Sequence, residues 1–106
     1  MSAAAKAVDY EHLRSQAAGN IDVMREVLSL FDTHCEQVLT ELENAVDAKA
    51  WKQWTHTLKG SARGVGAFSV AEAAAEAERH PMDKSKLAPI RAAFAEARAF
   101  IGKHPL

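Results

Sequence analysis

The sequence has few of the residues that build disulfides, membrane spans or one-signed charged surfaces. Its single cysteine, Cys35, rules out an internal disulfide and fits a reducing compartment. Its apolar runs are far shorter than the roughly 20 residues of a transmembrane helix, and its N-terminus does not resemble a signal peptide. Thirteen basic and fourteen acidic residues nearly cancel, which gives no sign of a nucleic-acid or anionic-membrane partner. We therefore expect a soluble, cytoplasmic protein.

Histidine pairs of the kind that bind metals are also missing. The five histidines are each more than 20 residues apart, so none forms the i, i+3 or i, i+4 pair of a helical metal site. A chain of 106 residues is long enough for one core and too short for two. We therefore predict a single domain with no metal and no cofactor of its own.

What the sequence does contain is alanine, in 22 copies, with β-branched residues scattered and no strict alternation of apolar and polar residues. This composition predicts an all-α fold. Asp9 is a candidate N-cap for a short helix through about Gln16, and Asn20 is one for a second helix of about 25 residues. The second helix has one continuous apolar stripe, formed by Met24, Leu28, Phe31, Cys35, Val38, Leu42 and Ala45.

The third helix is predicted to begin after Asp47 and to run to about Arg63, where Gly64 and Gly66 interrupt it. Its inward face is expected to comprise Trp51, Trp54, Leu58 and Ala62. The two tryptophans are therefore interpreted as core anchors.

The fourth helix is marked by Ser69 and Glu72, which have the spacing of a capping box, although the helix could begin a turn earlier. It is rich in alanine and should stop at Pro81. The last helix opens near Asp83 or Ser85. Its apolar stripe is Leu87, Ile90, Phe94, Ala97 and Ile101.

One long, one medium and two shorter amphipathic helices, joined by short loops, favour an antiparallel up-and-down four-helix bundle. The short first helix is expected to cover one end of it. We predict that residues 9–103 form this domain, with a flexible tail at 1–8 and a C-terminal tail at 104–106. The stripes leave no spare apolar face, so a monomer is expected.

His56 points away from the core on the predicted third helix. At 100° per residue, Trp51, Trp54 and Leu58 lie roughly 160–220° from it. Its own side has a different composition, with Lys52, Lys59, Gly60 and Arg63. An exposed imidazole among cations suits a dianionic phosphoryl group.

Carboxylates are missing from the sequence around His56. No Asp or Glu lies three or four residues to either side of it, and none occurs between Asp47 and Glu72. Nothing in this helix could then act as a general base on water, whereas a neutral imidazole can attack phosphorus with its own lone pair. We hypothesise that a phosphohistidine here would survive long enough to be passed on.

The segment HTLKGSA at residues 56–62, followed by Gly64 and by Gly66-Ala67, resembles the histidine-containing phosphotransfer (HPt) family. The family pattern is H-x-L-K-G-S-[SA] followed by a small or apolar pair with glycine, and the match extends over about a dozen residues. The helices fit the family's four-helix bundle over roughly residues 9–103. Val65, where Leu or Ile is commoner, and the alanine-rich fourth helix depart from the pattern in ways that concern packing.

The resemblance implies that Nε2 of His56 accepts a phosphoryl group from a receiver-domain aspartate or a sensor kinase. The group would then pass to a response-regulator aspartate in a multistep phosphorelay. Lys59 would balance the phosphoryl charge, and Gly60 would leave room for the partner. Further candidates for partner docking are Gly64, Lys52, Arg63, Gln53 and Leu13.

The implied partners are receiver domains of response regulators and of hybrid histidine kinases, which would themselves hold any Mg²⁺. The chain has no nucleotide-binding motif, so we expect a phosphoryl carrier and not a kinase or ATPase. Core packing of Leu13 is as plausible as docking.

Two alternatives stay open. The chain could be the phosphotransfer module of a larger sensor kinase, although the initiating methionine favours a complete chain. It could also be a helical adaptor that binds a partner without phosphate chemistry.

Overall fold

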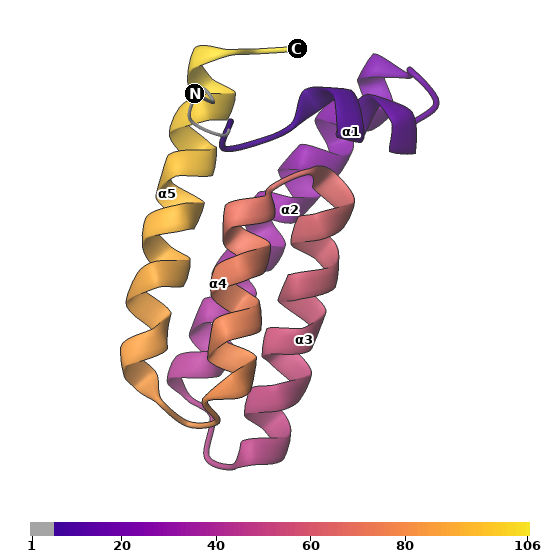
Figure 1. The fold of residues 1–106 in the computed structure, drawn as a ribbon. Coiled ribbons are helices and arrows are strands. Elements are labelled where there is room, and N and C mark those ends of the chain that lie inside the picture. Colours follow the sequence, from indigo (N-terminus) through magenta and orange to yellow (C-terminus); the bar gives the residue numbers. More distant parts are fainter. Residues whose placement is uncertain (1–5) are drawn as a thin grey trace.

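The computed structural model describes residues 6–106, and these residues are helical apart from short connections. The elements in order are α1 (Tyr10–Gln16), α2 (Ile21–Glu43), α3 (Ala48–Val65), α4 (Phe68–Arg79), the short 3₁₀ helix η1 (Lys84–Lys86) and α5 (Leu87–Lys103). The all-α prediction is confirmed. The four longer helices lie side by side, with α3 packed against α2 and α4, and α5 packed against α4 and α2 (Figure 1). α1 lies across one end and contacts α2 and α3.

The predicted N-caps of the first three helices are confirmed. The side-chain oxygens of Asp9, Asn20 and Asp47 each accept a hydrogen bond from the backbone N–H three residues on, at 2.8–3.1 Å. Each bond satisfies one of the N–H groups that a helix start leaves without a partner.

The predicted capping box at Ser69 is wrong, because α4 begins at Phe68 with Ala67 as an N-cap that has no side-chain hydrogen bond. The reason lies in the turn before it. Gly66 ends α3 in the left-handed region, with φ +84°, and the chain re-enters a helix two residues later, ahead of Ser69. The predicted stop holds, since α4 ends at Arg79, ahead of Pro81.

The core is built largely from the predicted stripes, although Trp54 of α3 and Ile101 of α5 are only partly buried. Every predicted stripe residue within α2 is buried, and Trp51, Leu58 and Ala62 of α3 have no exposed surface. The Trp51 indole N–H donates to the carbonyl of Ala77 in α4 at 2.7 Å, which satisfies its polar atom inside the core. This bond and the surrounding apolar contacts fix the rotation of α3 about its axis against α4, and so determine which of its residues face outward.

Residues assigned to the predicted tails pack against the bundle. Residues 1–5 lie outside the described part of the chain, but Val8 is fully buried, and the N–H of Asp9 donates to the carbonyl of Gly66 at 2.9 Å. At the other end, the Tyr10 hydroxyl donates to the carbonyl of His104 at 2.7 Å. Apolar burial and these backbone partners hold Val8, Asp9 and His104 against the bundle.

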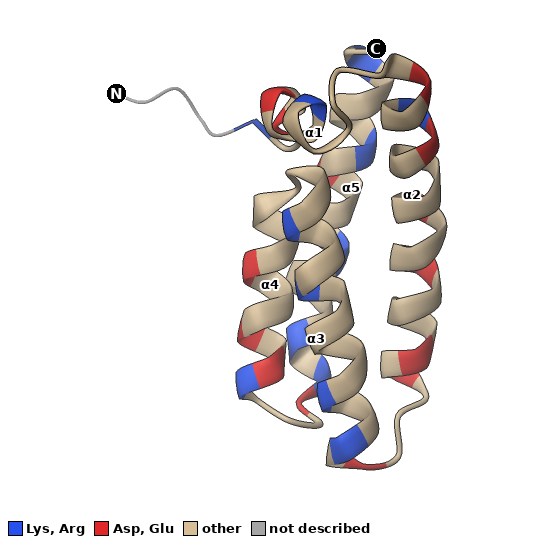
Figure 2. Cartoon of the chain, turned by 90° about the vertical axis from the view of Figure 1, so that its right-hand side faces the viewer, with Lys and Arg blue, Asp and Glu red and all other residues tan. Residues whose placement is uncertain are grey.

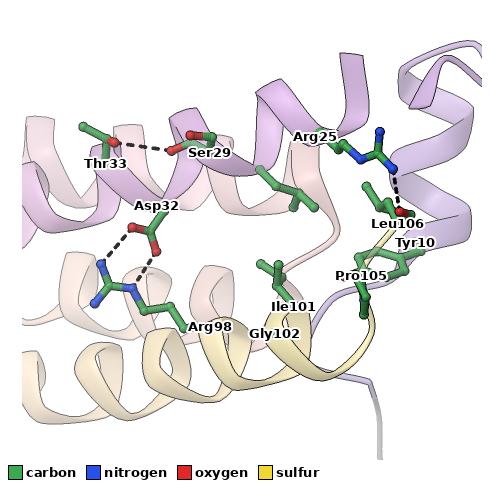
Figure 3. Close-up of a pocket in the computed structure, with 11 residues that line it drawn as sticks. Tyr10, Arg25, Ser29, Asp32, Thr33, Arg98, Ile101, Gly102, Pro105 and Leu106 are labelled. Atoms are coloured by element: carbon green, nitrogen blue, oxygen red, sulfur yellow. Dashed lines mark hydrogen bonds and ion pairs between the residues drawn. The ribbon is translucent and has the colours of Figure 1, made fainter. Parts of the chain in front are cut away.

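The C-terminal residues Pro105 and Leu106 line one side of a cavity between α2 and α5 (Figure 3). Arg25 donates to the carbonyl of Leu106 at 2.7 Å, and Arg98 pairs with Asp32 across the two helices. The cavity among these residues has a volume of about 630 Å³. None of the helices in residues 6–106 combines the length and the apolar character that crossing a bilayer requires.

Candidate functional site

His56 lies on the exposed face of α3, as predicted. Its side chain is 68 % exposed, whereas Trp51 and Leu58 on the opposite face are fully buried. Asp47 sets the start of α3 two turns earlier, and the buried Thr55 hydroxyl donates to the carbonyl of Trp51 at 2.9 Å. The imidazole is thus displayed on a helix whose other face is locked into the core.

A carboxylate from α4 reaches His56. Oε2 of Glu78 lies 3.2 Å from Nδ1 of His56, and Oε1 of Glu78 accepts a hydrogen bond from Nζ of Lys59 at 2.7 Å. The predicted absence of carboxylates along the helix is confirmed, because α3 contains none. The carboxylate beside His56 comes instead from the next helix, which the sequence around His56 does not include.

Glu78 is held in its charged form by its neighbours. The hydrogen bond from the Lys59 ammonium lowers the pKa of the Glu78 carboxyl from its ordinary value, and His56 contributes less in the same direction. Both Glu78 oxygens have partners within the protein, and the side chain is only 16 % exposed. Lys59, predicted to balance a phosphoryl charge, lies beside His56 with its ammonium on this carboxylate.

Three other cations of α3 are exposed. Lys49, Lys52 and Arg63 take part in none of the ion pairs formed by residues 6–106. Basic segments recur along α3 in Figure 2, whereas acidic segments lie on α4 and α2. Lys49, Lys52, Gln53 and His56 line one depression of about 280 Å³, so the predicted residues Lys52 and Gln53 are brought next to the histidine.

Gly60 and Gly64 have open space where a side chain would be. An added Cβ at either position would meet no atom within 4 Å, so the fold itself does not require glycine there. A glycine inside a helix costs about 1 kcal/mol relative to alanine. An external reason, such as the close approach of a partner, would explain both glycines.

A groove of about 440 Å³ runs between α2 and α3 on the Gly64 side of His56. Its lining includes Val27, Leu30, His34, Thr57, Ser61 and Gly64. Leu30 is 61 % exposed, and Nε2 of His34 is buried with no hydrogen-bond partner among residues 6–106. Burial also lowers the pKa of His34, which favours its neutral form. The groove thus offers an apolar and uncharged surface next to the exposed face of α3 that contains Lys52 and Arg63.

Leu13 does not belong to this surface. It is 1 % exposed and is part of the core, so the prediction that it docks a partner is wrong. α1 crosses the end of the bundle and contacts α2 and α3, so its inward residue is buried. The alternative prediction of core packing for Leu13 is confirmed.

Glu78 could have been found from the register of the α3–α4 hairpin. His56 lies eleven residues before Ala67, and Glu78 lies eleven residues after it. Helices that fold back on each other through a short turn bring such positions to the same level along their axes. An acidic residue at the level of a lone exposed histidine was the available signal.

Two comparisons found known proteins that this chain resembles. The Hpt domain family matches residues 26–100 of the chain. The crystal structure of the histidine phosphotransferase ShpA from Caulobacter crescentus is similar, with a TM-score of 0.67 and 33 % sequence identity over 92 % of each chain. A search of curated protein sequences found no match.

Proposed function

This chain belongs to the Hpt domain family, and on that premise we propose that Nε2 of His56 carries a phosphoryl group between partner proteins. Hpt domains are phosphocarrier modules of phosphorelays rather than kinases, and they work with receiver and kinase partners. The observation that supports His56 as the carrier is its exposed imidazole, bonded through Nδ1 to Glu78 and bordered by basic residues.

The proposed donor is the phosphoaspartate of a receiver domain, or a sensor kinase, and the acceptor is a response-regulator aspartate. In the first step the Nε2–P bond forms as the bond between phosphorus and the aspartate oxygen breaks. The second step is the reverse on a new partner. Positioning and electrostatic balance supply most of the catalysis in such transfers. Any Mg²⁺ would belong to the receiver domain, and the chain would need no cofactor.

The receiver is proposed to dock over His56 and the α2–α3 groove. Its aspartate must come within bonding reach of Nε2, so the partner's surface has to lie close to α3 on both sides of that atom. Gly60 and Gly64 remove side chains from this approach, and Leu30 offers exposed apolar surface in the groove that Gly64 also lines. Lys52, Gln53 and Arg63 would contact the acidic surroundings of the partner's aspartate.

The proposal extends to the architecture and state of the protein. Short connections and the side-by-side packing of α2, α3, α4 and α5 support an antiparallel, up-and-down bundle. We propose that residues 9–103, together with the flanking residues packed against them, form the working unit, that it acts as a monomer, and that it works in the cytoplasm.

The test is transfer of radiolabelled phosphate from a phosphorylated receiver domain. The wild-type protein should gain label that is labile to acid and stable to base, as expected for phosphohistidine. His56→Gln should abolish the label, while the matched control His80→Gln, at another exposed histidine of the chain, should keep it. Circular dichroism would establish that both variants keep their helices.

Two results would contradict the proposal. Labelling of His56→Gln as strong as that of wild type would move the site elsewhere. Complete absence of label on wild type, across a panel of receiver domains that it binds, would favour the adaptor function without phosphate chemistry.

A further inference from the structure

The imidazole of His56 has two different surroundings. Its Nδ1 edge faces α4, where Oε2 of Glu78 lies at 3.2 Å. Its Nε2 has no hydrogen-bond partner among residues 6–106, and most of the side chain is exposed. The two ring nitrogens, which are chemically similar in free imidazole, are therefore unlike in the protein.

The carboxylate of Glu78 is itself fixed. Its second oxygen accepts from Lys59 at 2.7 Å, so Lys59, Glu78 and His56 form a hydrogen-bonded chain that links α3 to α4 and back. With Oε1 held by Lys59, Oε2 is directed at the histidine ring. The chain positions the ring without any direct contact to Nε2.

An ionised carboxylate has no hydrogen to donate. A hydrogen bond between Glu78 and Nδ1 therefore requires the ring proton to be on Nδ1, and neutral His56 then has its lone pair on Nε2. Carboxylates select a histidine tautomer in the same way in hydrolytic triads. The structure thus points to one nitrogen as the nucleophile.

We propose that Glu78 is a positioning residue that selects Nε2 of His56 for phosphoryl transfer and balances the positive charge of the phosphorylated ring. This inference rests on the proposed function. As the Nε2–P bond forms, the electron pair of the broken P–O bond leaves with the partner's aspartate, and the ring keeps its proton on Nδ1. The imidazole ring becomes cationic with no proton gained or lost, and the Glu78 carboxylate faces that charge.

The charge balance has a consequence for both directions of transfer. A carboxylate that stabilises the cationic ring favours the phosphorylated form of His56, so more phosphoryl groups are on the protein at equilibrium with a receiver. Loss of a charge-assisted hydrogen bond at a partly exposed site is expected to change a rate or an equilibrium constant by roughly tenfold.

The experiment compares Glu78→Gln and Glu78→Ala with wild type by two measurements. The first is ¹⁵N NMR of the unphosphorylated ring, which reports the tautomer of His56. The second is the rate and equilibrium of transfer from a phosphorylated receiver. Glu72→Gln is the matched control, because Glu72 is exposed on the same helix and forms no ion pair among residues 6–106.

Wild type and Glu72→Gln should show mainly the Nδ1–H tautomer. Glu78→Ala should show a mixture, with the transfer rate and equilibrium constant lowered by about tenfold. Glu78→Gln keeps an acceptor oxygen without the charge, so it should retain the tautomer and lose part of the rate. This variant is nearly isosteric, which guards against a failure of the alanine variant to fold.

A wild-type tautomer and a wild-type rate in both Glu78 variants would overturn the proposal. A changed tautomer with an unchanged rate and equilibrium would overturn the catalytic part of it. The NMR measurement uses no phosphate. If wild type accepted no label, the proposed function would fail, and the tautomer would still decide whether Glu78 orients the ring.

Discussion

Gly66 and Gly60 are close in sequence but differ in what surrounds them. Gly66 has φ +84°, and a Cβ there would lie 2.6 Å from the backbone oxygen of Asp9. Gly60 sits inside α3 with no atom within 4 Å of the same position. The fold requires Gly66, because two chain segments cross there without room for a side chain. It does not require Gly60, which lowers the stability of the helix relative to alanine.

The two glycines should therefore respond in opposite directions to alanine. Gly66→Ala is expected to lower the free energy of unfolding by about 2–4 kcal/mol, from left-handed strain and the clash with Asp9. Gly60→Ala should raise it by about 0.5–1 kcal/mol, because alanine favours helix. Urea denaturation followed by circular dichroism measures both. Equal stability of Gly66→Ala and wild type would contradict the close approach of Asp9.

At the scale of the element, α3 depends on its first turn to present His56. The Asp47 carboxylate accepts from the N–H of Ala50 at 2.8 Å, and α3 has no acidic residue in its first turn to reinforce this cap. A helix that begins without its cap loses order first in the turns nearest that end.

Asp47→Ala is expected to reduce the free energy of unfolding by about 1 kcal/mol, whereas Asp47→Asn should retain most of the stability. The midpoints of thermal unfolding, compared among the three proteins, check this. If Asp47→Ala melted at the wild-type temperature, the cap would have no energetic role.

Local signals predicted most of the helices and failed where distant segments meet. The caps at Asp9, Asn20 and Asp47 and the stripe of α2 act within a few turns, so the sequence around them was sufficient. The C-terminal end of α2 has no basic residue of its own, and Lys84 supplies the donor to the carbonyls of Leu42 and Glu43 at 2.7–2.8 Å. A sequence separation of about forty residues hides such a contact from any local pattern.

For the candidate site too, the features that depend on one helix were predicted and those that depend on helix packing were not. The exposure of His56 and its neighbours on α3 followed from helical periodicity. Glu78, Leu13 and Val8 were missed or misassigned because their environments depend on which helices pack together. Periodicity indicates which residues of a helix face inward, but not which partner helix they meet.

At the scale of the whole molecule, two ion pairs each join one helix of the bundle to another. Asp32 of α2 pairs with Arg98 of α5, and Glu78 of α4 pairs with Lys59 of α3. The hydrogen bond from Arg98 lowers the pKa of Asp32, and that from Lys59 lowers the pKa of Glu78. Both carboxyl groups therefore bind protons less readily in the folded protein than in the unfolded chain.

Stability should consequently depend on acidity. These ion pairs contribute to the free energy of unfolding at pH values above the ordinary pKa of a carboxyl group. The contribution is lost as the pH falls through the lowered pKa that each carboxyl has in the folded protein. We expect the free energy of unfolding to decrease from about pH 5 to about pH 2, with a shallower decrease in Asp32→Asn. Urea unfolding at a series of pH values measures the slope. Glu96→Gln is the control, since Glu96 forms no ion pair among residues 6–106, and an unchanged slope in Asp32→Asn would refute the assignment.

The burial of Cys35 has a consequence for the chemical reactivity of the protein. The thiol has no exposed surface, and burial raises its pKa to about 12. Alkylating reagents and peroxides attack the thiolate, which is nearly absent at neutral pH in the closed molecule. Modification of this sulfur should therefore depend on transient opening of the domain and not on oxidant concentration alone, so the thiol stays inert while the His56 side chain is exposed.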